Sequence, residues 1–398
     1  MRGFWLVVAA GAGVLAINMG VRQTFGLYVA PISADLGVGR EAVGLAIAIL
    51  NLAWGAAAPF AGGFVDAYGA GRVILGGAAL YAGGLLLMAG AQGEAALMLS
   101  GALIGLGVAG TGFSAVLGVV GRAAPIDQRQ LALSLATMGS AIGQFVALPF
   151  AHALMDAHGW ALSLVALAAL VAAMAPLGSG LSTAPMARDA DAQSFQEALS
   201  EAARHRGFWL LTGGFFVCGF HIAFVAVHLP GYLAQQGFSA HMGVAALMIV
   251  ALANIAGTYL CGRAGDVIEK RLALTLLYGA RALIFVAFVF APPTQVSVIV
   301  FAALLGLLWL GTIPLTSGML ATFFGPRWLS MLYGVVFFSH QVGSFLGAWL
   351  GGRAFDALGS YTAMWWVCAG LGVLAALLNW PIREEPSPRL AAQAGATP

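Results

Sequence analysis

Residues 62–69 read Gly62-Gly63-Phe64-Val65-Asp66-Ala67-Tyr68-Gly69, an apolar, glycine-rich run that contains one aspartate, Asp66. Three similar stretches follow, His152–Gly159 (HALMDAHG), Gly262–Glu269 (GRAGDVIE) and Gly351–Gly359 (GGRAFDALG). Their aspartates are separated by 90, 110 and 90 residues, so the pattern of each half recurs after 200 residues. The halves also open alike, since RGFWL stands at both 2–6 and 206–210. The chain is therefore a tandem repeat of two related halves.

The composition excludes a water-soluble fold. Of 398 residues, 61% are hydrophobic and 8% are charged, against about 45–50% and about 25% in an ordinary soluble domain. Glycine is abundant, with 55 residues, which suits close helix packing in lipid because small residues let backbones approach. We expect an all-α polytopic membrane protein.

Twelve apolar stretches are long enough to cross the bilayer, which takes about 20 helical residues. The predicted spans are 4–32, 42–65, 73–92, 95–120, 129–154, 160–180, 207–234, 242–265, 272–291, 296–323, 328–354 and 361–381.

The aspartates predict how the spans are arranged. Three spans separate the paired aspartates within a half, so Asp66 and Asp266 should lie on one side of the membrane and Asp156 and Asp356 on the other. This is an inverted three-helix repeat inside each six-helix half, the symmetry that alternating access requires because equivalent gates must close on opposite faces. The alternative is that aspartates merely mark helix ends, which leaves their equal spacing unexplained.

The chain is predicted to divide into a first half at 1–180, a linker at 181–205, a second half at 206–383 and a disordered tail at 384–398. The linker is the longest polar interval, and Ser194-Phe195-Gln196-Glu197 within it is a capping-box pattern. Phe195, Ala198, Leu199 and Ala202 then share one helical face, which predicts a short amphipathic helix.

Charge placement predicts the orientation. Thirteen of the 17 lysines and arginines fall on the side of the termini and two, Arg40 and Arg353, on the other. By the positive-inside rule both termini are cytoplasmic, and we expect a multi-pass protein of the cytoplasmic (inner) membrane. The net charge of +2 and the lack of a basic cluster with aromatics give no indication of nucleic-acid binding.

Two arginines, Arg22 and Arg281, fall within predicted spans, whereas no acidic residue lies in the central part of one. A cation in the membrane is costly, so it normally faces a cavity, pairs with a partner or marks a substrate path. An anionic substrate is an attractive counter-ion for Arg22. The alternatives are that Arg22 snorkels to the interface and that Arg281 is structural, bonded to neighbouring backbone.

Three histidines also fall within spans, His221 and His228 in the seventh and His340 in the eleventh. A seven-residue step is nearly two helical turns, so His221 and His228 share a face. An imidazole can change its charge near neutral pH, so these residues are candidates for coupling protons to anion movement. The alternative is a hydrogen-bonded histidine that packs between helices.

Further polar groups in the spans complete the candidate substrate site. With Arg22, His221 and His340, the candidates are Tyr28, Asn51, Gln144, Asn254 and Gln341, although each could instead bond neighbouring helices. Cys218, Cys261 and Cys368 also lie in spans and are expected to be packing residues. No set of ligands at metal-binding spacing occurs, and we expect neither a metal nor a cofactor.

Residues 62–72, GGFVDAYGAGR, resemble the signature loop between helices two and three of the major facilitator superfamily, and Gly262-Arg263-Ala264-Gly265-Asp266 with Lys270-Arg271 resembles its echo in the second half. The resemblance covers nearly the whole chain. It implies two six-helix bundles, and it implies that the carboxylate of the loop helps to latch a cytoplasmic gate. The candidate gate residues are therefore Asp66, Arg72, Asp156, Asp266 and Asp356.

Within the superfamily, the chain resembles the monocarboxylate porters and oxalate/formate antiporters. It rests on RGFW at 2–5, RQTFGLY at 22–28, RQLAL at 129–133 and GSAIGQ at 139–144. In monocarboxylate porters a basic residue on helix one contributes to carboxylate binding, and Arg22 falls at about that place. The chain lacks the family's helix-eight arginine, where Asn254 and Gly257-Thr258 stand. It also lacks the helix-eleven lysine of oxalate carriers, for which His340 is the nearest candidate.

These features predict a secondary transporter for a small organic anion, a monocarboxylate, driven by proton symport and functional as a monomer in the lipid bilayer. With few fixed cations, a single carboxylate suits the site better than two. The alternative within transport is a proton-coupled exporter of hydrophobic drugs, against which the Gly-Pro pair typical of antiporter helix five is absent. A membrane enzyme or a transport-like sensor is a remote alternative, because no catalytic trio, paired carboxylates or phosphate loop is present.

Overall fold

The computed structural model describes residues 2–38, 40–181 and 193–395. Within these ranges the chain is helical, and eleven helices are long and apolar enough to cross a membrane. The predicted all-α membrane fold is confirmed.

The eleven candidates account for the twelve predicted spans because one of them, Ile126–Ser179, is 54 residues long and contains two. The helical path is interrupted at Gly159, whose φ is 80° and ψ is 168°. Only glycine adopts such angles without strain. Gly159 therefore makes the turn between the predicted fifth and sixth spans.

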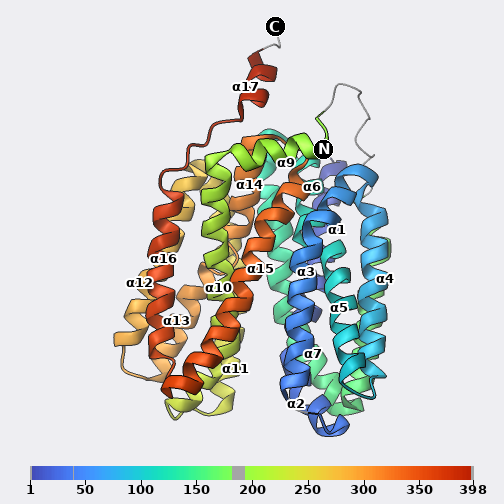
Figure 1. Ribbon diagram of the computed structural model, residues 1–398, viewed down its shortest axis with the longest axis vertical. Coiled ribbons are helices and arrows are strands. Elements are labelled where there is room, and N and C mark those ends of the chain that lie inside the picture. Colours follow the sequence, from blue (N-terminus) through green and yellow to red (C-terminus); the bar gives the residue numbers. More distant parts are fainter. Residues whose placement is uncertain (1, 39, 182–192, 396–398) are drawn as a thin grey trace. The chain divides into compact units, whose positions relative to one another are not determined.

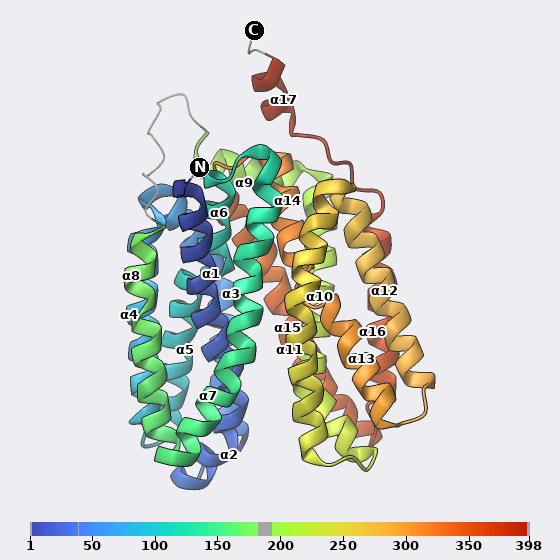
Figure 2. The ribbon, with the colours of Figure 1, turned by 180° about the vertical axis from the view of Figure 1, so that it is seen from behind.

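The helices group into two compact units. The first consists of residues 1–126, 135–192 and 326–335, among those the structure describes. Its helices are α1 (Arg2–Gln23), α2 (Phe25–Leu36), α3 (Arg40–Tyr68), α4 (Ala70–Ala89), α5 (Glu94–Thr111), α6 (Phe113–Ala123), most of α7 (Arg129–Ala172) and α8 (Met174–Ser179). In this unit α5 packs against both α3 and α4, and α8 lies beside α4 (Figures 1 and 2).

The second unit consists of residues 127–134, 193–325 and 336–398, again among the described residues. Its helices are α9 (Phe195–Arg204), α10 (Arg206–Gln235), α11 (Ala240–Val267), α12 (Lys270–Phe290), α13 (Gln295–Leu307), α14 (Thr312–Phe324), most of α15 (Leu329–Leu358), α16 (Thr362–Asn379) and α17 (Pro388–Gly395). Here α12 packs along α16 and α11 along α13 (Figure 2).

The units differ from the two sequence halves in two short segments. Residues 326–335, from the second half, belong to the first unit, and residues 127–134, from the first half, belong to the second. The two segments are related by the 200-residue repeat.

Four predicted spans are each broken into two helices. The first is interrupted at Thr24, between α1 and α2; the fourth at Gly112, between α5 and α6; the sixth at Ala173, between α7 and α8; and the tenth at residues 308–311, between α13 and α14. The breaks in the fourth and tenth spans lie at neighbouring positions of the repeat, since Gly112 corresponds to Thr312. Pro314 accounts for one of them in part, because a proline in the first turn of α14 cannot continue a helix from α13.

Glycine lets helices touch at equivalent places in the two units. A Cβ on Gly143 of α7 would lie 1.9 Å from the carbonyl oxygen of Ala16 on α1, and one on Gly343 of α15 would lie 2.0 Å from that of Phe216 on α10. No larger residue fits at such distances. The backbones therefore approach directly, as membrane helices with small residues do.

The short helix α9 begins with a capping box. The Ser194 hydroxyl accepts a hydrogen bond from the Glu197 N–H at 3.3 Å, and the Glu197 carboxylate accepts one from the Ser194 N–H at 2.7 Å. These hydrogen bonds lower the pKa of Glu197. One face of α9 is buried through Ala198 and Ala202.

The tail differs from the prediction of disorder, because residues 388–395 form α17. Its start is anchored by polar contacts: Ser387 N donates to the Phe323 carbonyl at 2.8 Å, and Arg389 pairs with Glu201 of α9 at 3.1 Å. Burial raises the pKa of Glu201, but hydrogen bonds, including those from Arg389 and Gln193, outweigh it and hold that pKa below its ordinary value. The composition of the tail could not reveal these partners, which are distant in sequence.

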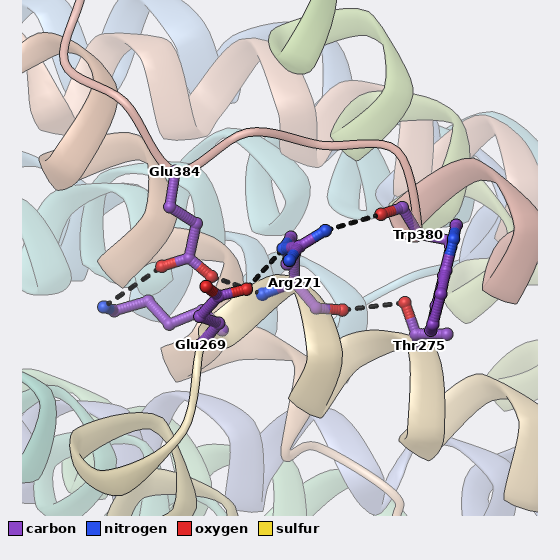
Figure 3. Close-up of polar contacts among 6 residues, drawn as sticks. Glu269, Arg271, Thr275, Trp380 and Glu384 are labelled. Atoms are coloured by element: carbon purple, nitrogen blue, oxygen red, sulfur yellow. Dashed lines mark hydrogen bonds and ion pairs between the residues drawn. The ribbon is translucent and has the colours of Figure 1, made fainter.

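A second anchor holds the chain before α17 (Figure 3). The Glu384 carboxylate accepts a hydrogen bond from the Arg271 N–H at 2.6 Å and lies 3.7 Å from the Lys270 ammonium. Arg271 also donates to the Trp380 carbonyl at 3.2 Å and pairs with Glu269. An anion at the N-terminus of α12 is stabilising because the first N–H groups of a helix lack partners.

His205 caps α10 through its ring. Its Nδ1 accepts a hydrogen bond from the Phe208 N–H at 3.2 Å, which requires that this nitrogen carry no proton. Burial lowers the pKa of His205, and Glu201 offsets part of this effect.

We therefore expect acid to weaken the cap. A group whose pKa is lower in the folded state contributes stability that is present above its unfolded pKa of about 6.5 and is lost as the pH falls through the folded pKa. The Tm of purified protein should fall between pH 7.5 and 5.5, by the equivalent of about 1 kcal/mol. His205→Asn, which caps without titrating, should flatten this slope, and His158→Asn, at an exposed position, should not. An unchanged slope in His205→Asn would contradict the role of the cap.

Candidate functional site

Arg22 lies in the last turn of α1 and carries its charge without an acidic partner. Its Nη2 donates to Asn51 Oδ1 at 2.8 Å, and its Cζ lies 4.9 Å from the centre of the Trp54 ring. Its Nε is buried and has no hydrogen-bond partner. Among the described residues no carboxylate lies within 4.0 Å of it.

The neighbours of Arg22 on α3 are held in place by that helix. Asn51 Nδ2 donates to the Ile47 carbonyl at 3.1 Å, which turns Oδ1 toward the guanidinium. Trp54 is buried one turn further on, and its ring face attracts a cation. The structure thus brings together two predicted site residues, Arg22 and Asn51, and adds Trp54. The three-residue step from Asn51 to Trp54 puts both on one helical face, and this spacing is the sequence signal for Trp54.

The other candidates of the first unit are not part of this group. Tyr28 belongs to α2, beyond the break at Thr24, and its hydroxyl lies 2.6 Å from that of Ser163. Gln144 donates to the Ser140 carbonyl of its own helix at 3.2 Å. Both are buried.

In the second unit His340 and Gln341 are in contact. His340 Nδ1 lies 3.1 Å from Gln341 Oε1, and its ring stacks on Phe337 at 5.2 Å between centroids. His340 Nε2 is buried and makes no hydrogen bond among the described residues. Asn254 lies elsewhere: its Oδ1 accepts hydrogen bonds from Leu310 N and Thr258 Oγ1, both at 3.0 Å.

His221 and His228 bond to different helices. Nε2 of His221 lies 2.8 Å from the Cys368 carbonyl of α16, and Nε2 of His228 lies 2.7 Å from the Ala348 carbonyl of α15. Because a carbonyl only accepts, each Nε2 is the donor. Each of the two histidines therefore forms a hydrogen bond between helices, as expected of a histidine that packs between them.

Asp66 is the most buried of the predicted gate residues whose side chains the structure describes, with an exposed fraction of 2%. It forms an ion pair with Arg122 of α6, and its Oδ2 accepts a hydrogen bond from the Met331 N–H at 3.0 Å in the first turn of α15. Arg122 also reaches the Pro326 carbonyl, at 3.5 Å. The carboxylate therefore links α3 and α6 to the segment 326–335 of the same unit, and it sits where a helix N-terminus favours an anion.

The remaining predicted gate residues are placed differently. Arg72 is exposed, and among the described residues Asp66 pairs with Arg122 instead. Asp266 lies 3.9 Å from Arg263 on its own helix, and Asp156 lies 3.2 Å from His152, with both side chains more than half exposed. The side chain of Asp356 lies outside the described residues.

Two helical units with carboxylates at span ends, and a cation within a span that has no acidic partner among the described residues, are typical of a polytopic membrane transporter. The family model described as Major Facilitator Superfamily matches residues 11–348, and the chain belongs to this superfamily.

Relatives of known name agree with this assignment. The chain is 24% identical over 388 residues to the uncharacterized MFS-type transporter YcxA of Bacillus subtilis, covering 92% of each chain. It is 26% identical to monocarboxylate transporter 13 of Rattus norvegicus, covering 94% of this chain and 88% of that one. It is 24% identical to the oxalate:formate antiporter of Oxalobacter formigenes, covering 91% and 87%. The resemblance to these two groups is confirmed.

The fold is also that of a solved member of the superfamily. The structure of FucP in the outward conformation matches with a TM-score of 0.75 at 16% identity, covering 95% of this chain and 99% of that one.

We expect the Asp66–Arg122 pair to be important for stability. Removing one partner of a buried pair typically costs about 3–5 kcal/mol because the other charge is left uncompensated. Asp66→Asn and Arg122→Gln should each lower the Tm in detergent by several degrees, and the double variant should lose less than the sum of the two. The exposed Asp156→Asn is the matched control and should change the Tm little. Additive losses, or an equal loss in the control, would contradict the coupling.

Proposed function

We propose that this chain is a secondary active transporter that moves a small organic anion, a monocarboxylate, across the cytoplasmic membrane by alternating access with proton symport. In this proposal both termini are cytoplasmic, the chain acts as a monomer, and Arg22 holds the substrate carboxylate. The observation that carries the proposal is the guanidinium of Arg22, which lacks an acidic partner among the described residues.

The surroundings of Arg22 support anion binding. A cation in a membrane-spanning helix is costly, and a bound carboxylate would offset that cost. A guanidinium presents a planar set of donors that matches a carboxylate in a bidentate way. Asn51 and the Trp54 ring occupy one donor and one face, so they orient the guanidinium while leaving the buried Nε without a partner.

The named relatives support the substrate class. Two kinds of relative are named for carboxylates, the monocarboxylate transporters and the oxalate:formate antiporter. A single guanidinium suits one carboxylate rather than two. This is why we propose a monocarboxylate.

His340 is the proposed proton-coupling residue. His221 and His228 each spend a ring nitrogen on a backbone carbonyl of a neighbouring helix. His340 keeps Nε2 without a partner, while Gln341 contacts Nδ1. An imidazole with an unused nitrogen can take up and release a proton without breaking an interhelical hydrogen bond.

Uptake into proteoliposomes tests the anion and Arg22 together. We expect saturable uptake of at least one member of a panel of labelled monocarboxylates. Arg22→Gln should reduce it by about tenfold or more, because a buried charged hydrogen bond to the substrate is lost. Arg72→Gln, at an exposed position, is the matched control and should transport normally. Wild-type uptake in Arg22→Gln would remove Arg22 from the site, and efflux of lipophilic cations without any carboxylate uptake would overturn the substrate class.

Proton coupling is tested in the same vesicles. An inward proton gradient should stimulate uptake by the parent protein. His340→Gln, which cannot titrate, should abolish this stimulation while still exchanging labelled for unlabelled substrate across the membrane. The exposed His152→Gln should behave as the parent. Stimulation that persists in His340→Gln would exclude His340 as the coupling residue.

A further inference from the structure

The break between α13 and α14 leaves backbone groups without helical partners, and side chains from two other helices bond to them. Arg281 of α12 donates through Nη2 to the carbonyls of Leu308 and Trp309, the latter at 2.6 Å. Asn254 of α11 accepts from the Leu310 N–H at 3.0 Å. In the apolar part of a bilayer each unpaired group would cost several kilocalories per mole, so a break there needs such partners.

Arg281 is held as a fully buried cation without a carboxylate within 4.0 Å among the described residues. Its Nη1 lies 3.5 Å from Cys218 Sγ, and its Cζ lies 5.5 Å from the Tyr278 ring. It stands at the C-terminal end of α13, where the exposed carbonyls of a helix favour a positive charge. The break itself thus provides the negative end that stabilises the guanidinium.

At the corresponding break in the first unit, side chains at the corresponding positions of the repeat form the hydrogen bonds, but the residues differ. Asn18 of α1, 200 residues before Cys218, donates to the Val108 carbonyl at 3.3 Å and to Thr111 Oγ1 at 2.5 Å. Tyr81 of α4, 200 residues before Arg281, reaches the Asn18 carbonyl at 3.4 Å. Val108 is the counterpart of Leu308, so the same carbonyl is paired in both units.

The two sets exchange roles. In the first unit the residue of the opening helix, Asn18, donates to the Val108 carbonyl, and Tyr81 donates to the carbonyl of Asn18. In the second unit Cys218 stands at that position and contacts Thr312 at 3.1 Å, but a thiol is a weak donor. Arg281, at the position of Tyr81, supplies the donor instead.

We propose that Arg281 is the positioning residue of this break: its guanidinium holds the carbonyls of Leu308 and Trp309 and thereby fixes where α14 begins, as Asn18 does for Val108 in the first unit. The start of α14 carries Thr312 and Thr316, both buried, and Thr316 Oγ1 has no hydrogen-bond partner. Arg281 therefore sets the position of these hydroxyls without touching a transported molecule.

The repeat suggests an experiment, because the residue pair of one unit can be introduced at the corresponding positions of the other. Arg281→Tyr alone should speed hydrogen–deuterium exchange of peptides that cover residues 305–313 by about tenfold or more, since the charged hydrogen bonds that resist local opening are lost. Adding Cys218→Asn, the pair found in the first unit, should restore slow exchange. Peptides that cover 105–113 should not change in either variant. The measurement uses the whole chain in detergent and no substrate, so its outcome is independent of the proposed anion.

The reverse exchange is the matched experiment. Asn18→Cys alone should speed exchange at 105–113, and adding Tyr81→Arg should restore it. Unchanged or slower exchange at 305–313 in Arg281→Tyr, or double variants no closer to the parent than the single ones, would overturn the proposal. If Arg281→Tyr alone does not fold, folded protein from Arg281→Tyr with Cys218→Asn is the supporting result, and its absence is the overturning one.

Discussion

Every peptide group in the apolar core of a bilayer needs a hydrogen-bond partner inside the protein, because no water is there to replace it. The long helices of this chain meet that requirement by themselves. Where a helix breaks, side chains must take over, and they do so at residues 308–311 through Arg281 and Asn254. At the equivalent break in the first unit Asn18 does the same for Val108. The positions of the buried polar residues therefore follow largely from the positions of the breaks.

The same constraint distinguishes three arginines. Arg122 pairs with the Asp66 carboxylate, and Arg281 is surrounded by carbonyls at the end of a helix. Arg22 has one amide oxygen and one aromatic ring, which offset less of the cost of its charge. Arg122 and Arg281 therefore each have a role in stabilising the folded protein. Arg22 is the one whose position is better explained by a ligand, and this is the reason the proposed substrate is an anion.

The sequence was sufficient to predict the spans, because hydropathy over about 20 residues is a local property, and the repeat, because the aspartates are spaced evenly. Contacts between segments that are distant in sequence could not be predicted from it. The motif places Arg72 near Asp66 in sequence, whereas the ion-pair partner of Asp66 is Arg122, 56 residues away, and this pairing depends on how α6 packs on α3. Helical periodicity put His221 and His228 on one face but could not show that each meets the carbonyl of a different neighbour. The composition of the tail predicts disorder, but composition does not show that the tail contacts Glu201 and Phe323, which belong to other helices.

The exchange of residues 127–134 and 326–335 between the sequence halves has a consequence for how the protein can be divided. Gly62 and Gly118 of the first unit lie against Ser330, and Gly262 and Gly318 of the second lie against Ser134 and Gln130. A chain cut in the linker would give two fragments that each lack a strip of their own packing.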